Sequence, residues 1–187
     1  MASAHGPGSA RTTPARASPS SLSIALRPAF ASWLGWLADP DRPLVFVLDP
    51  DQDRADLVRQ ALKVGYHHLA GELGGGVAAW EAAGHPTCHV GLVPAAEVAG
   101  PVLDVRQDVE FEEGHLPGAR HVELGAVPSE IAELDDGGSL TVMCGHGERA
   151  MTGASLLARA GRTDVAVAVG GPDDWAAARD RRLLTGR

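Results

Sequence analysis

The two halves of this chain carry the same order of sequence signals, displaced by 95 positions, and this repeat constrains the fold more than any other feature. The identical pairs are Arg54 and Arg149, Ala55 and Ala150, Gly75 and Gly170, Gly76 and Gly171, and Trp80 and Trp175. Residues of this kind, at helix starts and glycine turns, mark the corners of a structural unit. The chain therefore encodes one supersecondary unit twice.

Each unit is predicted to run strand, loop, helix, strand, glycine turn and short helix. The first half supplies Leu44–Leu48 as a fully buried strand, then Arg54–Val64, Leu69–Leu73 and Val77–Ala83; the second supplies Leu140–Met143, Arg149–Ala160, Val165–Val169 and a helix containing Trp175. A further strand is expected at Val102–Val105. Strands that alternate with helices predict an α/β fold with a parallel sheet.

The two units are unequal in length. The second is preceded by an additional segment, from Leu103–Arg106 to Gly114–Ala119, that has no counterpart in the first. We therefore expect a disordered tail over 1–28, an incomplete and inactive repeat over 29–86, a linker with a possible short strand over 87–98, and a complete domain over 99–187. The tail is acid-poor and contains Arg and Ser, like an organelle transit peptide, but its many Pro and Gly residues oppose an amphipathic helix and favour a disordered tail without a targeting function.

Composition excludes several classes of function. A formal net charge of −8 argues against a general nucleic-acid binder, because there is no basic excess to displace counterions. No apolar run approaches the roughly 20 residues that cross a bilayer, so no membrane partner is expected. Two cysteines, Cys88 and Cys144, do not make a disulfide framework in a chain of 187 residues. A reducing, cytoplasmic location is the expectation.

Cys144 stands between a predicted strand and a predicted helix, in a loop with two glycines. The loop continues as Gly145, His146, Gly147, Glu148 and Arg149. Backbone N–H groups of such a loop, together with a helix N-terminus, can converge on the sulfur and favour its thiolate, which is the nucleophilic form. Taken alone, Cys144 is better interpreted as a buried structural thiol.

Five spaced motifs decide between these two interpretations of Cys144. They are Asp104-Val105-Arg106, Glu110-Phe111, Gly114-His115-Leu116-Pro117-Gly118-Ala119, the loop from Cys144 to Arg149, and Gly170-Gly171 with Trp175. Their order over roughly 99–181 resembles the rhodanese-like sulfurtransferases. The tandem arrangement is similar to the rhodanese tails fused to metallo-β-lactamase-fold persulfide dioxygenases.

The resemblance implies a doubly wound parallel sheet, with one complete domain preceded by an incomplete rhodanese-like repeat. It implies that Cys144 takes a sulfane sulfur as a persulfide and passes it to a thiol or another nucleophilic acceptor. The family pattern places Gly145, His146, Gly147, Glu148 and Arg149 in the substrate-binding loop, with Asp104, Arg106 and His115 as structural support. Small sulfur donors such as thiosulfate or low-molecular-weight persulfides, thiol acceptors and a persulfide dioxygenase are the implied partners. No cofactor and no metal are expected.

Two positions depart from this pattern. Glu148 places a carboxylate in an anion-binding loop, where it repels anionic donors if it faces the sulfur and does little if it faces solvent. In the first repeat Asp49 stands at the position of Cys144, and Asp51, Asp53 and Pro50 follow it. A carboxylate cannot carry a sulfane sulfur, and proline removes a backbone N–H, so this repeat is expected to be inactive.

Other classes of function remain open at this point. A non-catalytic binding module and a cysteine-based phosphatase or arsenate reductase are the alternatives, although four residues between Cys144 and Arg149 suit a sulfur better than a phosphate. His67, His68, His85, Cys88 and His89 match no usual zinc spacing.

Overall fold

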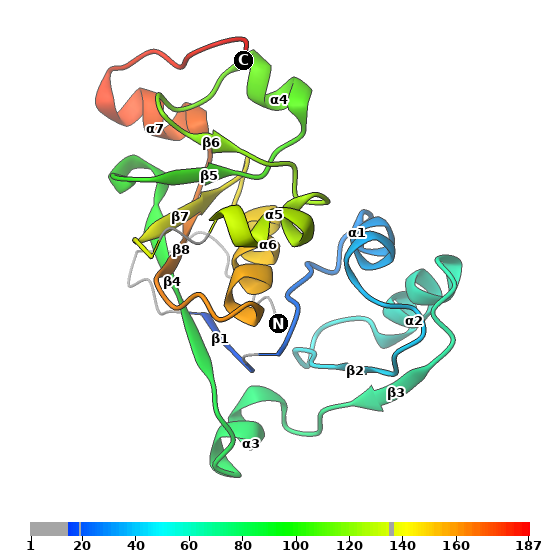
Figure 1. Ribbon diagram of the computed structural model, residues 1–187. Coiled ribbons are helices and arrows are strands. Elements are labelled where there is room, and N and C mark those ends of the chain that lie inside the picture. Colours follow the sequence, from blue (N-terminus) through cyan, green and yellow to red (C-terminus); the bar gives the residue numbers. More distant parts are fainter. Residues whose placement is uncertain (1–14, 19, 135–136) are drawn as a thin grey trace.

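A computed structural model describes residues 15–18, 20–134 and 137–187, and its main feature is a six-stranded sheet with the order β1-β4-β8-β7-β5-β6 (Figure 1). The strands are β1 (Ala15–Ala17), β4 (Cys88–Pro94), β8 (Val165–Val169), β7 (Leu140–Met143), β5 (Val102–Asp104) and β6 (Arg120–His121). The strands β4, β8, β7, β5 and β6 run parallel to one another, and β1 pairs antiparallel with β4 at the edge of the sheet.

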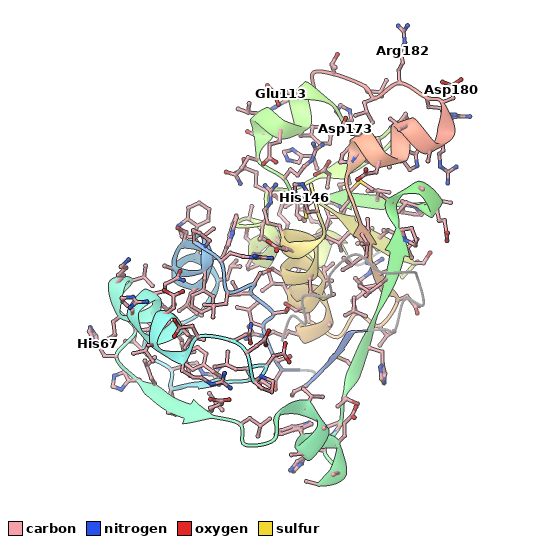
Figure 2. All side chains as sticks on the ribbon, turned by 180° about the vertical axis from the view of Figure 1, so that it is seen from behind. His67, Glu113, His146, Asp173, Asp180 and Arg182 are labelled. Atoms are coloured by element: carbon pink, nitrogen blue, oxygen red, sulfur yellow. The ribbon has the colours of Figure 1, made fainter. Side chains whose placement is uncertain are left out.

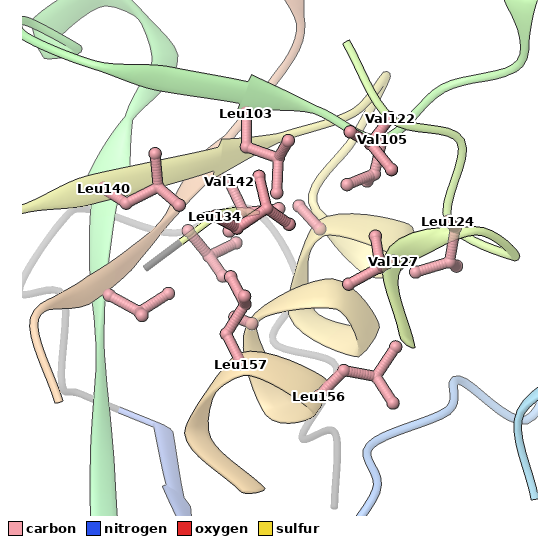
Figure 3. Packing of buried hydrophobic residues seen from close by; sticks show 14 of the residues in the cluster. Leu103, Val105, Val122, Leu124, Val127, Leu134, Leu140, Val142, Leu156 and Leu157 are labelled. Carbon is pink, nitrogen blue, oxygen red and sulfur yellow. The ribbon is translucent and has the colours of Figure 1, made fainter. Parts of the chain in front are cut away.

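Both faces of this sheet are covered. Helices α5 (Val127–Leu134) and α6 (Glu148–Arg159) pack on one face, and α7 (Pro172–Arg179) with the 3-10 turn η1 (Ala95–Glu97) packs on the other. Successive strand residues alternate between the two cores: Val142 faces α5 and α6 (Figure 3), whereas Met143 faces α7. This alternation follows the two-residue period of a strand, and it confirms the predicted doubly wound α/β sheet.

The first half of the chain forms a separate, smaller unit. It contains α1 (Phe30–Leu37), β2 (Leu44–Phe46), α2 (Arg54–Lys63), β3 (Leu69–Glu72) and α3 (Gly76–Ala82). Strands β2 and β3 pair in parallel in a two-stranded sheet, and Phe30, Leu34, Leu57, Ala61 and Tyr66 form its buried core.

The prediction of a fully buried strand at Leu44–Leu48 was wrong. Val45 is 62% exposed, while Leu44, Phe46 and Leu48 pack against the small core. The two-stranded sheet buries only one of its faces, so alternate side chains face solvent. A continuous apolar run in the sequence does not distinguish this arrangement from a strand buried on both faces.

The segment 87–98 is not a linker. Residues 88–94 form β4, and Gly91 to Pro94 pair with Ala166 to Val169 of the central sheet. Val90 is buried among the residues of one core, and Ala95 and Val98 are buried in the other. The larger domain therefore begins with β4, about ten residues before the expected boundary at 99.

The expected tail over 1–28 also needs correction. Residues 1–14 and 19 lie outside the described residues, but Ala15–Ala17 form β1 and the chain then runs beside α6 (Figure 1). The backbone N–H of Ser23 donates a buried hydrogen bond of 3.0 Å to Oγ of Ser155. Leu22 packs on the core of the larger domain, whereas Ile24 and Leu26 pack on the smaller core. The segment therefore packs against both units, first on the larger core and then on the smaller.

Among the described residues, no helix combines the length and the apolar character that crossing a membrane requires.

Candidate active site

The candidate nucleophile lies where the central strand of the parallel sheet ends. Strand β7 runs between β5 and β8 and ends at Met143; Cys144 follows, and α6 begins at Glu148. Figure 2 shows His146 at the N-terminal end of α6, where its side chain is exposed. The crevice at the carboxyl ends of the strands is where open α/β sheets bind ligands.

The sulfur of Cys144 accepts a backbone hydrogen bond. The N–H of Gly147 lies 3.1 Å from Sγ, and Cys144 as a residue is 2% exposed. Gly147 is the N-cap of α6 with φ at 101°, a left-handed conformation that favours glycine. No side chain caps α6, so the partial positive charge of its N-terminus is directed at the loop. Both features stabilise negative charge on sulfur.

The glycine pair after β8 makes room for this loop. A Cβ atom at Gly171 would lie 2.6 Å from the backbone oxygen of Gly145, a distance that real Cβ atoms essentially never show. Gly170 adopts a φ of 107°, and a Cβ there would lie 3.0 Å from the Cβ of Ala95. Gly171 therefore packs directly against the cysteine loop, whereas Gly170 packs against Ala95 outside that loop.

Arg149 is held by a glutamate from another helix. Its Nη1 and Nη2 atoms donate to the two carboxylate oxygens of Glu110 in α4 (Asp108–Glu113), at 2.5 and 2.7 Å. The hydrogen bond from Arg149 holds the pKa of Glu110 below its usual value, and Glu110 in turn raises the pKa of Arg149. Glu110 was not among the predicted site residues. The Glu110-Phe111 motif was visible in the sequence, but the pairing joins positions 39 residues apart.

The predicted supporting residues connect the end of β5 with α4 and the residues that follow it. Arg106 donates from Nε and Nη2 to the carboxylate of Asp104 at 2.7–3.0 Å, and it also donates to the carbonyl of Gly114 at 2.7 Å. Both members of this ion pair are buried. The ring of His115 stacks on Phe111 with centroids 3.8 Å apart. These contacts tie the end of β5 to α4, which carries Glu110.

Glu148, in the first turn of α6, is paired with a cation. Its Oε1 accepts a hydrogen bond of 3.1 Å from Nε of Arg27, and the two side chains are 48% and 59% exposed. Glu148 therefore stands at the outer rim of the loop, paired with a cation from the N-terminal segment. The sequence left its orientation open.

In the aligned loop of the first half, backbone carbonyl groups, and not N–H groups, point inward. Nη1 of Arg54 donates to the backbone oxygens of Asp49, Pro50 and Gln52 at 2.9, 3.1 and 2.6 Å. The carboxylate of Asp53 accepts the N–H groups of Ala55 and Asp56, the first free donors of α2. Carbonyls therefore point into this loop, and a side chain already occupies the helix N-terminus.

No group of three or more His, Cys, Asp or Glu side chains within the described parts of the chain could hold a metal ion. Cys88, which the sequence placed among possible zinc ligands, lies in β4 as a free thiol, as Cys144 is a free thiol in its loop.

Comparison with known proteins adds a family to this geometry. The model of the rhodanese-like domain matches residues 92–178. The chain is 34% identical over 76 residues to thiosulfate sulfurtransferase GlpE of Pseudomonas putida, covering 41% of this chain and 69% of that protein. It is also 34% identical over 74 residues to the putative sulfur carrier protein YrkF of Bacillus subtilis, covering 40% of each chain.

A solved structure, the rhodanese-related protein of Thermoplasma volcanium, superposes with a TM-score of 0.46 at 21% identity, covering 51% of this chain and 99% of that chain. The sequence match to GlpE extends over more than two thirds of that protein, and the matched family model includes β5 to α7, with the cysteine loop between them. The chain belongs to the rhodanese-like family.

Proposed function

We propose that this protein is a sulfurtransferase that carries a sulfane sulfur on Cys144. The observation that supports this most directly is the hydrogen bond from the Gly147 N–H to Sγ of Cys144, at the uncapped N-terminus of α6. A persulfide has its negative charge on the outer sulfur, so backbone donors at this loop would stabilise the intermediate as well as the attacking thiolate. Relatives named thiosulfate sulfurtransferase give independent support.

The reaction proceeds in two displacements. The Cys144 thiolate attacks the outer sulfur of thiosulfate, the sulfur–sulfur bond of the donor breaks, and sulfite leaves with the electron pair. An acceptor thiolate then attacks the outer sulfur of the Cys144 persulfide and departs as a new persulfide, which regenerates the Cys144 thiolate. The electrons balance within these two displacements, so the proposed steps call on no cofactor and no metal.

The loop residues have separate roles in this proposal. Gly147 donates its backbone N–H to the sulfur, Gly145 would supply a second backbone N–H to the outer sulfur of the persulfide, and exposed His146 would meet the incoming donor. Arg149 keeps its positive charge at any assay pH, as arginine does, and Glu110 raises its pKa further. Asp104, Arg106 and His115 hold the surrounding elements together.

The donors that suit this loop are thiosulfate and low-molecular-weight persulfides, and the acceptors are thiols. A relative named as a sulfur carrier supports a thiol acceptor. A persulfide dioxygenase would consume the low-molecular-weight persulfide that such a transfer produces, and is the protein partner we propose.

The two free thiols suit the cytoplasm. We also propose that the unit at 29–86 is an inactive rhodanese-like repeat.

The test is a transfer assay with thiosulfate or glutathione persulfide as donor and cyanide or a thiol as acceptor. Cys144→Ser should abolish turnover, because serine cannot form a persulfide, while Cys88→Ser should leave turnover unchanged. Sulfite released from thiosulfate should match the sulfur delivered to the acceptor. Full turnover in Cys144→Ser would refute the proposal.

A further inference from the structure

The segment 20–28, called here the strap, connects the two units of the protein along the helix that follows the cysteine loop. It is anchored to α6 at Ser155 by the buried backbone hydrogen bond from Ser23, and Leu22 packs beside it on the larger core. From there the strap rises beside α6 towards α1 (Figure 1). Its last contact with α6 is the ion pair of Arg27 with Glu148, in the first turn of the helix.

This anchoring brings a cation to the rim of the candidate active site. Glu148 directly follows Gly147, whose N–H contacts Sγ of Cys144. The carboxylate of Glu148 therefore belongs to the rim of the cysteine loop, and an unpaired negative charge at this rim would repel an anionic donor as it approaches. Arg27 lies 3.1 Å from that carboxylate and offsets its charge. An ion pair this exposed contributes little to folding stability, so replacing Arg27 should leave the fold intact and change mainly the charge of the rim.

We propose that Arg27 is a specificity-determining residue, which neutralises Glu148 and so allows the Cys144 loop to accept dianionic sulfur donors. This inference rests on the proposed sulfurtransferase function. The strap thus contributes one charge to the rim, although it contributes no nucleophile. The effect is on the approach and binding of the donor, so it concerns KM and leaves kcat unchanged.

The experiment measures KM and kcat for thiosulfate, a dianion, and for methanethiosulfonate, a monoanion, in low-salt buffer. Arg27→Gln leaves Glu148 unpaired, and the KM for thiosulfate should rise on the order of 10-fold at unchanged kcat. The KM for the monoanion should rise by roughly the square root of that factor, because its charge is half as large. Both effects should shrink above about 0.5 M salt, where the screening length is only a few ångströms.

Glu148→Gln should act in the opposite direction and lower the KM for thiosulfate. The double variant Arg27→Gln/Glu148→Gln restores the net charge of the rim, so its KM should return close to that of the unmodified protein. A purely structural role of Arg27 would not produce this return, because removing Glu148 cannot repair a misplaced strap.

Arg59→Gln is the matched control. Arg59 is 60% exposed, against 59% for Arg27, and pairs with Asp56 at 3.0 Å within α2, in the first unit. Its KM for both donors should equal that of the unmodified protein. If Arg27→Gln likewise leaves KM unchanged while the unmodified protein forms the persulfide, the role of Arg27 is refuted. If the unmodified protein forms no persulfide with either donor, the proposed function itself fails.

Discussion

The loops at 49–54 and 144–149 occupy equivalent places after a strand and before a helix, but their polar groups are arranged in opposite ways. In the second loop a backbone N–H points at Sγ of Cys144, and Arg149 turns to Glu110. In the first loop Arg54 donates hydrogen bonds to three backbone carbonyls, and the carboxylate of Asp53 accepts the backbone N–H groups at the start of α2. An anion site of this kind requires unoccupied N–H groups. The first loop thus differs from the second in its backbone, in addition to lacking a cysteine.

The two units also differ in how much they bury. The larger domain packs a five-stranded parallel sheet between two cores, whereas the smaller has two strands with one covered face. The smaller unit gains support from α1, whose Trp33 and Leu37 pack on the core of the larger domain. The stability of the smaller unit should therefore depend on the larger domain, whereas the larger domain should depend less on the smaller unit.

The largest expected effect tests where the larger domain begins. A piece comprising residues 95–187 lacks β4, and with it buried Val90 and the partner strand of β8. Burial of one such side chain contributes roughly 2 kcal/mol, and the lost strand contacts add to that, against a total stability of about 5–15 kcal/mol. This piece should fail to fold by circular dichroism.

A piece comprising residues 87–187 retains β4 and serves as the control. It should fold, with a lower melting temperature than the full chain, and keep its kcat at saturating donor. A folded but inactive 87–187 piece would show that the first unit supplies something essential to the chemistry.

The second prediction concerns the steric fit of the glycine turn. Gly171→Ala places a methyl group against the backbone oxygen of Gly145, and this oxygen can move only if the cysteine loop moves. A shift of about 1 Å in a catalytic group can reduce a rate about 100-fold, so a loss of this size is expected in kcat. The equivalent Gly76→Ala meets no atom within 4 Å and strains only its own left-handed φ of 61°, so turnover should persist. Equal loss in both variants would contradict a steric role specific to the second loop.

The third prediction concerns the Glu110–Arg149 pair. Glu110→Gln should lower the free energy of unfolding by about 1 kcal/mol near pH 7, a value kept small because Glu110 is 38% exposed. The pKa of Glu110 is lowered in the folded protein, so the stability from the charged pair is present above the usual glutamate pKa of about 4.3. It is lost as the pH falls through the lowered value. Melting curves from pH 3 to pH 7 should therefore converge at the acid end, and a constant difference would contradict this origin.

The smallest expected effect is the absence of any gain in Asp49→Cys. The introduced thiol would lie in a loop where backbone carbonyl oxygens turn towards Arg54. The carboxylate of Asp53 already accepts the backbone N–H groups at the start of α2, so these groups could not stabilise the thiolate. In a Cys144→Ser background, this variant should form no persulfide by intact mass. A persulfide on the thiol introduced at position 49 would show that the loop can rearrange.

The sequence was sufficient to predict those features that depend on local pattern. The strand Leu140–Met143, the following loop and the helix from residue 148 lie close to their expected bounds, because the apolar run and the glycines define them. Strand β4 was expected only as a possible short strand in a linker, because His89 and Gly91 interrupt its apolar residues and Pro94 ends it, a composition typical of a loop.

Contacts between distant positions could not be predicted. The orientation of Glu148 depends on Arg27, which is 121 residues earlier in the chain. The partner of Arg149 is Glu110, which the sequence marked as part of a motif without predicting the helix that carries it. Ion pairs of this kind arise from the arrangement of whole elements, about which periodicity carries no information.

The most direct test is to locate the transferred sulfur by peptide mass spectrometry. The full chain is incubated with thiosulfate, alkylated and digested, and the peptides containing Cys88 and Cys144 are compared. We expect the mass of one additional sulfur, about 32 Da, on the Cys144 peptide alone, removed by later treatment with cyanide. An additional sulfur on the Cys88 peptide, with none on Cys144, would contradict the assignment of Cys144 as the sulfur carrier.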